Sequence, residues 1–108
     1  MHTVEYIQTQ RLSTDELTLW LKNALTNMAM FERVEVVCDD KPNERDVYTR
    51  LESGRVMLNR QRLINTGWES WDVQSVGYRA ADGVMVWTFP LGVATNVELR
   101  CIQRPQIP

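Results

Sequence analysis

The sequence has almost no histidine, and this excludes several kinds of catalytic site. His2 is the only histidine among 108 residues, and it stands next to the N-terminus. Nucleophilic catalysis by Ser-His-Asp or Cys-His arrangements needs a histidine held within the fold. Zinc sites built from several histidines fail for the same reason. No catalytic set based on histidine is therefore recognisable.

Glycine is also scarce. None of the five glycines belongs to a phosphate-cradling loop, a dinucleotide-binding fingerprint or a Gly-x-Ser-x-Gly elbow. They stand at Gly54, Gly67, Gly77, Gly83 and Gly92. We expect no cofactor, and we predict that the protein is not an enzyme.

Only two cysteines are present, and both end apolar, strand-like runs. We interpret Cys38 and Cys101 as buried, reduced thiols that pack as small hydrophobic residues. The alternative is a disulfide, but two cysteines do not form a disulfide framework.

Long apolar runs are missing as well. No stretch approaches the roughly 20 residues that cross a bilayer, so we expect no membrane association. The N-terminal residues 1–10 lack the basic start and apolar run of a secretory signal. We expect a cytoplasmic protein with one domain over residues 1–108. Residues 104–108 contain two prolines and are expected to form a flexible tail.

Lysine is scarce relative to arginine, with two lysines against ten arginines in a chain of net charge −2. The cations gather in residues 41–62, which carry a net charge of +3, whereas residues 1–40 carry −4. Arginine binds carboxylates and phosphates in a forked geometry and stacks on aromatic rings, so it favours contact surfaces. The simpler interpretation is a solvated strand face with ordinary ion pairs.

The segment after Leu12 predicts an amphipathic helix. Ser13 is a good N-cap, Glu16 completes a capping box, and Leu12 and Leu17 suit a hydrophobic staple. Leu19 projects away from the apolar stripe and is a candidate partner contact. The stripe recurs at helical spacing as Leu17, Trp20, Leu21, Ala24, Leu25 and Met28.

The remaining segments predict short strands separated by turns. Residues 31–38 and 97–103 favour strands, and residues 68–79 and 84–91 form the clearest hairpin through the turn 80–83. Both faces of residues 84–91 are apolar, so we expect a central strand or one covered on both sides.

The structure of three further segments is also predicted: residues 3–8, 39–46 and 55–64. Residues 3–8 predict a short strand, and residues 39–46 predict a loose loop. Residues 55–64 fit a strand and a helix about equally, and the flanking glycine turns favour a strand. The predicted fold class is α+β, with one long amphipathic helix packed on an antiparallel, largely meandering sheet of five or six strands.

An acidic cluster suggests a metal site. Asp39, Asp40 and Glu44 follow the strand at 31–38, and carboxylates at a strand end can hold Mg²⁺ for phosphodiester cleavage. The second carboxylate of such nucleases usually comes from another strand, and here a solvated acidic turn explains the residues more simply.

Residue types that are common at protein–protein interfaces are abundant, and they give the leading functional hypothesis. Four Trp, three Tyr, five Met and ten Arg are many for 108 residues, and these types are enriched at interface centres. One helix covers only one face of a sheet, so we expect the other face to meet a partner or a second copy. The candidate partner-binding residues are Leu19, Arg50, Arg55, Arg60, Arg62 and Trp68.

The sequence therefore predicts a non-enzymatic protein–protein interaction module that self-associates as a homodimer. It would serve as an adaptor, an assembly component or an inhibitor, roles common among small accessory proteins of phages and plasmids. The alternative is a nucleic-acid-binding protein that uses the arginine-rich segment 50–62. The third hypothesis is a small Mg²⁺-dependent nuclease.

Overall fold

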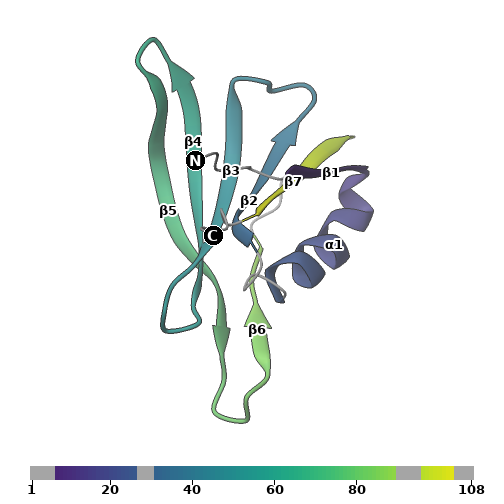
Figure 1. Ribbon diagram of the computed structural model, residues 1–108, viewed down its shortest axis with the longest axis vertical. Coiled ribbons are helices and arrows are strands. Elements are labelled where there is room, and N and C mark those ends of the chain that lie inside the picture. The colour runs from purple at the N-terminus through teal and green to yellow at the C-terminus, as the bar shows by residue number, and fades with distance from the viewer. Residues whose placement is uncertain (1–6, 27–30, 90–95, 104–108) are drawn as a thin grey trace, which may run out of the picture.

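The structure is a computed structural model that describes residues 7–26, 31–89 and 96–103. These residues form seven strands and one helix, so the prediction of an α+β fold with an antiparallel sheet is confirmed (Figure 1). The elements are β1 (Ile7–Leu12), α1 (Thr14–Thr26), β2 (Phe31–Cys38), β3 (Glu44–Arg50), β4 (Val56–Ile64), β5 (Gly67–Arg79), β6 (Met85–Trp87) and β7 (Val97–Gln103).

The seven strands make one sheet in the order β1-β7-β2-β3-β4-β5-β6, and every neighbouring pair is antiparallel. Strands β2 to β6 follow one another as a meander. β7 instead returns to lie between β1 and β2. The sheet thus has one strand more than the five or six expected.

The additional strand is β3, which occupies part of the segment predicted as a loop. Glu44 and Asp46 belong to β3 and pair with Arg62 and Arg60 of β4. The loop between β2 and β3 is therefore shorter than residues 39–46. The strand interpretation of residues 55–64 is confirmed, because β4 pairs with a strand on each side over most of its length.

The helix α1 begins where its cap predicts but is shorter than expected. The Ser13 hydroxyl donates a hydrogen bond of 2.9 Å to Glu16 Oε1, and Leu12 and Leu17 are buried together in the core. The helix has 13 residues, so the prediction of a long helix is wrong. The start of β2 at Phe31 bounds how far a helix from Thr14 could extend. The predicted stripe residue Met28 lies outside the described residues.

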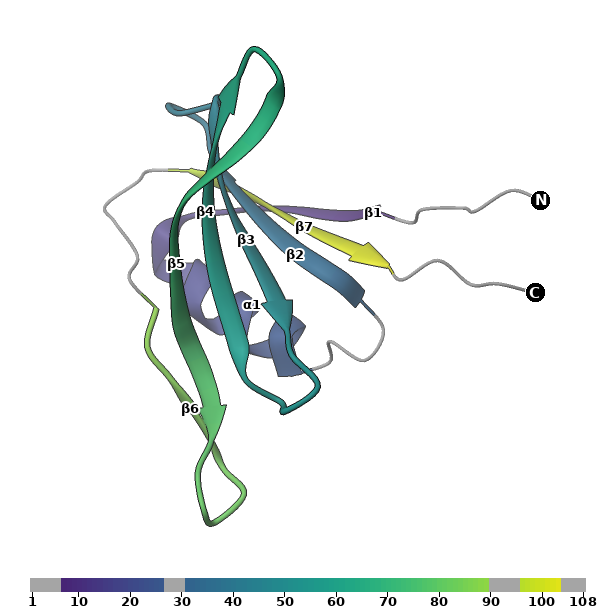
Figure 2. The same ribbon diagram turned by 90° about the vertical axis from the view of Figure 1, so that its left-hand side faces the viewer.

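The core lies between α1 and one face of the sheet, the helix-side face. Leu21 and Leu25 of α1 are fully buried with Val34 of β2 and Leu99 of β7. Figure 2 shows the strands fanning out with α1 against one side of them. Trp20, predicted in the buried stripe, is exposed. Because strands alternate, the residues between the core positions lie on the opposite, outer face of the sheet.

An aromatic stack covers the part of the helix-side face near β5. The rings of Trp87 and Phe89 stack at 5.4 Å between centroids, and Phe89 meets Tyr48 edge-on at 6.0 Å. The expectation that residues 84–91 form a central or doubly covered strand is wrong. β6 is an edge strand of three residues, and Val84 beside it is exposed. The apolar face of this segment that carries Val84 is therefore exposed to solvent.

The two cysteines are free thiols on the helix-side face. Cys101 is buried and Cys38 is partly buried. Cys101 pairs in register with Val34, four residues before Cys38 on β2, so the thiols are not neighbours. Burial raises the pKa of both thiols, and nearby carboxylates raise that of Cys38 further.

The Tyr48 hydroxyl gives the first testable prediction. Tyr48 is completely buried, and its Oη has no hydrogen-bond partner among the described residues. A buried polar atom without a partner costs about 1–3 kcal/mol. Tyr48→Phe should therefore raise the free energy of unfolding by about 1 kcal/mol, measured from the urea midpoint. A loss of stability would show that the hydroxyl makes a hydrogen bond, for example to a buried water.

No helix in the described ranges is long and apolar enough to cross a membrane. The predicted tail at residues 104–108 lies outside the described part of the chain.

Candidate functional site

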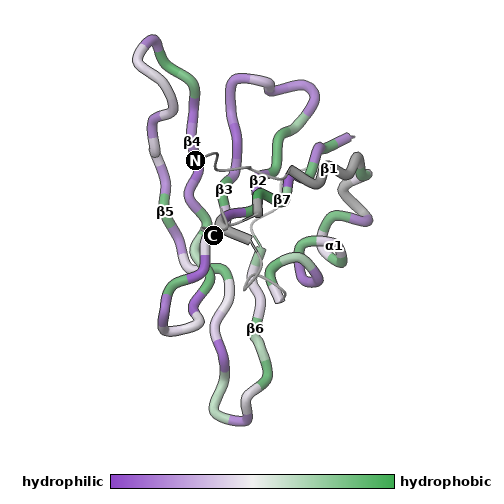
Figure 3. Tube along the Cα trace, in the orientation of Figure 1, coloured by the Kyte–Doolittle hydropathy of each residue, from purple (hydrophilic) through white to green (hydrophobic). Residues whose placement is uncertain are grey.

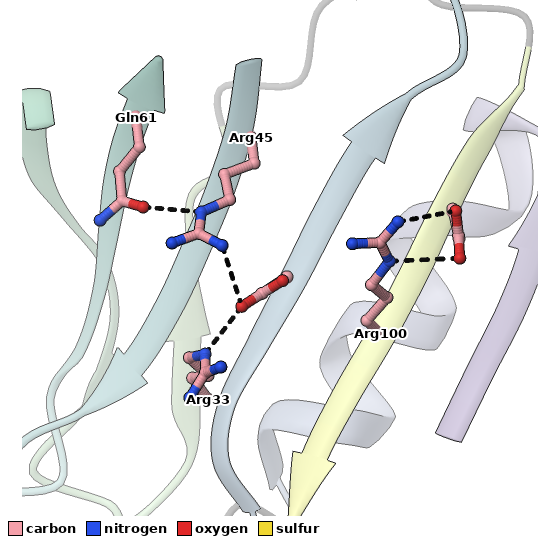
Figure 4. A network of polar contacts seen from close by, with 6 residues as sticks. Arg33, Arg45, Gln61 and Arg100 are labelled. Carbon is pink, nitrogen blue, oxygen red and sulfur yellow. Dashed lines mark hydrogen bonds and ion pairs between the residues drawn. The ribbon is translucent and has the colours of Figure 1, made fainter. Parts of the chain in front are cut away.

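A buried carboxylate on the outer face organises a cluster of polar side chains. Glu35 of β2 is only 3% exposed although the helix lies on the other face. Arg33 Nε donates to Glu35 Oε2 at 2.7 Å, and Arg45 Nη1 approaches the same oxygen at 3.5 Å (Figure 4). A buried carboxylate requires such partners, because the transfer of an unpaired charge out of water is costly.

Arg45 is held from three sides. Besides Glu35, its Nε donates to Gln61 Oε1 of β4 at 2.7 Å, and its guanidinium lies over the Trp68 ring at 4.2 Å. Burial is the main cause that lowers the pKa of Arg45, and the Arg33 and Arg100 guanidiniums lower it further. Three positive groups therefore crowd this part of the outer face.

Arg100 of β7 completes the cluster. It pairs in register with Glu35, and its Nε and Nη2 each donate to one oxygen of Glu98 at 3.2 Å. The bidentate hydrogen bonds to Glu98 raise the pKa of Arg100. We call this cluster the arginine network: Arg33, Arg45 and Arg100 with Glu35, Glu98 and Gln61 (Figure 4).

The arginine network continues onto an exposed apolar surface. Trp68, under Arg45, pairs with Leu63 near the turn between β4 and β5. In Figure 1 this hairpin projects beyond the body of the sheet, and Figure 3 shows hydrophobic residues at the end of β4. Its large apolar side chains are 37–57% exposed. We call them the hairpin patch: Leu63, Ile64, Trp68, Trp71 and Val73.

The structure does not bring the predicted partner-binding residues into one surface. Leu19 is 64% exposed on α1, away from the outer face. Arg50 and Arg55 lie at the β3–β4 turn, and Arg62 lies six residues beyond Val56, or about 20 Å along β4. Only Trp68 and Arg62 belong to the projecting hairpin tip.

The arginines of segment 50–62 are mostly engaged within the molecule. Arg60 Nε lies 3.9 Å from Asp46, and Arg62 Nε donates to Glu69 at 2.9 Å. Arg55 donates to the Ser75 hydroxyl at 3.2 Å. Segment 50–62 therefore presents paired charges rather than a continuous positive track.

The acidic cluster gains no support as a metal site. Among the described residues, no group of three or more His, Cys, Asp or Glu side chains could hold a metal ion, and these residues include Asp39, Asp40 and Glu44. Glu44 lies 4.0 Å from Lys41 in the turn, as an exposed ion pair. Burial raises the pKa of the Asp46 carboxyl, and the nearby Arg60 opposes that rise.

Sequence reasoning missed the most informative residues, Glu35 and Arg45. Glu35 alternates with buried valines, which predicts a solvated side chain, yet it is buried beneath arginines. Arg45 and Trp68 are 23 residues apart, and only the pairing of β3, β4 and β5 brings them together. A charged residue between two β-branched apolar ones was the only available signal for Glu35.

The comparison with protein-family models finds no match, and the comparisons with curated proteins and with solved structures find no significant similarity.

Proposed function

We propose that this chain is a non-enzymatic protein–protein interaction module that self-associates through the hairpin patch. The observation that carries the proposal is the exposure of five large apolar residues, two of them tryptophans, on one projecting hairpin. Leu63 and Trp68 pair in register and share one face of the hairpin, whereas Ile64, the next residue of β4, lies on the other face. Large exposed apolar side chains gathered on one hairpin are typical of contact sites, and tryptophan is enriched among the residues that dominate binding energy.

The charges around the hairpin patch suit a second copy of the same chain. Two arginines, Arg60 and Arg62, are balanced there by Glu69 and Asp72. A balanced surface does not repel its own copy, and the commonest soluble oligomers are dimers in which the same patch meets itself. A second copy of the hairpin can therefore cover these apolar side chains without charge repulsion.

The nucleic-acid alternative has weaker support. Non-specific single-strand binding needs open aromatic faces beside a track of unpaired cations. Here the Arg45 guanidinium covers one face of Trp68, and Arg62 is paired with Glu69. These contacts favour a protein partner over a nucleic acid.

Light scattering over a range of protein concentrations tests the proposal. We expect a dimer whose dissociation constant rises about tenfold or more in the Leu63→Ser, Ile64→Ser double variant, because two exposed apolar contacts are lost. Both side chains are more than 40% exposed in the chain, so the fold should not change. Circular dichroism checks the fold.

Leu19→Ser is the matched control, since Leu19 is equally apolar and more exposed but lies on α1. It should leave the dimer intact. A dimer weakened by Leu19→Ser and not by the hairpin variant would place the contact on the helix. A monomer at every concentration would refute self-association.

A further inference from the structure

The arginine network carries more positive than negative charge. Three guanidiniums, those of Arg33, Arg45 and Arg100, face two carboxylates, those of Glu35 and Glu98. The local excess is one positive charge in a chain of net charge −2. Within the network, therefore, the guanidiniums outnumber the carboxylates, in a chain whose net charge is negative.

Two of these arginines retain donors for a ligand. Arg45 uses Nε and Nη1, and Arg100 uses Nε and Nη2. Among the described residues, no hydrogen-bond acceptor is found for Arg45 Nη2 or Arg100 Nη1. The side chain of Arg100 is 38% exposed, so a ligand can reach it. The remaining donor of Arg100 is therefore open to an acceptor that comes from outside, and Arg45, whose side chain is 20% exposed, lies close to it.

The arginines are also held in place before a ligand arrives. Arg45 is fixed by Gln61, Glu35 and the Trp68 ring, and Arg100 is fixed by its bidentate pair with Glu98 (Figure 4). A side chain that is already ordered loses little conformational entropy on binding. The network therefore resembles a prepared anion site more than a set of mobile surface charges.

We propose that the arginine network is the docking site for an acidic segment of a second, different protein, whose carboxylates are bound by Arg45 and Arg100. This inference rests on the proposed function, because it names the chemistry of a partner for the same interaction module. Guanidinium groups recognise carboxylates in a planar, forked geometry, and the Arg100–Glu98 pair already displays that geometry.

Trp68 explains why a protein segment fits this site. The ring lies at the edge of the network, under Arg45, and joins it to the apolar hairpin patch. A partner that combines carboxylates with neighbouring apolar side chains would meet both features at once. Among the described residues, Arg33, Arg45 and Arg100 cluster around two carboxylates and do not form an extended row of cations that could follow a phosphate backbone.

Fluorescence anisotropy with a labelled glutamate-rich peptide tests the inference on the full chain. The matched peptide has glutamine at every glutamate position. We expect the acidic peptide to bind, its affinity to fall as salt rises, and the glutamine peptide to bind at least about tenfold more weakly. Equal binding of the two peptides would overturn the inference.

Substitutions of the two members of the Arg100–Glu98 ion pair should change peptide affinity in opposite directions. Arg100→Gln removes a donor and a positive charge, so peptide affinity should fall about tenfold. Glu98→Gln retains an amide oxygen that can accept a hydrogen bond from Arg100 but removes the competing negative charge, so affinity should rise about threefold. If the pair mattered only for stability, both variants would disturb the site alike and both would weaken binding. That result would refute the proposal.

Arg79→Gln is the matched control, because it removes the same charge from the β5–β6 hairpin, where Arg79 donates to the Gly83 carbonyl. It should leave affinity unchanged, and an effect equal to that of Arg100→Gln would mean that only net charge matters. If a single-stranded oligonucleotide binds more tightly than the acidic peptide and its binding depends on Arg100, the ligand of this site is a nucleic acid and not an acidic protein segment.

Peptide binding and self-association can be measured separately on the same chain. The peptide measurements can be repeated on the Leu63→Ser, Ile64→Ser variant, which retains the whole arginine network. If the chain dimerises but does not bind the acidic peptide, only the acidic docking site is refuted. If the chain is a monomer and its peptide affinity changes in the predicted directions in the variants, only self-association is refuted.

Discussion

Glu35→Ala is expected to lower the free energy of unfolding by about 3 kcal/mol, because it leaves two arginines on a crowded surface without their shared carboxylate. Arg33 and Arg45 both lose their contact with Glu35 Oε2, and their mutual repulsion, together with that of Arg100, is no longer balanced. Urea is the suitable denaturant, since guanidinium chloride would screen the same charges.

Glu69→Ala provides the comparison for Glu35→Ala. The Arg62–Glu69 pair is almost as short, at 2.9 Å against 2.7 Å for Arg33–Glu35, but both of its side chains are more than 40% exposed. Exposed pairs contribute about 0–1 kcal/mol, so Glu69→Ala should have little effect. Similar losses in the two variants would show that the burial of Glu35 does not determine its contribution.

Gly77→Ala is expected to destabilise the chain by about 2 kcal/mol through overpacking. A Cβ atom at residue 77 would lie 2.5 Å from the Trp87 ring, which packs directly on the glycine backbone. The ring would have to move, and its stack with Phe89 over Tyr48 would be lost. Aromatic pairs of this kind contribute about 0.5–1.5 kcal/mol beyond their buried area.

A double-mutant cycle identifies the cause of that loss. In a Trp87→Leu background the ring is absent, so Gly77→Ala should cost much less than in the original chain. Ser70→Ala, an exposed position on the same strand, should change stability by less than about 0.5 kcal/mol. If Gly77→Ala lowers the free energy of unfolding by the same amount in the Trp87→Leu background, the strain lies in the backbone and not in the contact with the ring.

Local patterns predicted the elements whose formation depends on neighbouring residues. The start of α1 follows from Ser13 and Glu16, and β7 occupies the predicted residues 97–103. The hairpin from β5 to β6 turns at residues 80–83, where Gly83 adopts a positive φ of 86° that suits glycine. These features need no information about the rest of the chain.

The sequence could not predict the features that depend on pairing across the sheet. Residues 84–91 have two apolar faces and suggest a central strand, but β6 comes last in the meander and so lies at the edge. Arg50, Arg55 and Arg62 are close in sequence, yet the length of β4 separates them. The arginine network joins β7, β2, β3 and β4, and its members are up to 67 residues apart, from Arg33 to Arg100.

The position of β7 has a consequence for how the chain folds. β1 and β2 are separated in the sheet by a strand that comes some 60 residues later, so their shared core cannot close until residues 97–103 have been made. Non-local pairing of this kind carries a loop-closure cost and slows folding to about milliseconds to seconds. A nascent chain that ends before Val97 would leave α1 without the strand that carries Leu99 and Cys101. Such a chain should stay open to proteases and chaperones until β7 is inserted.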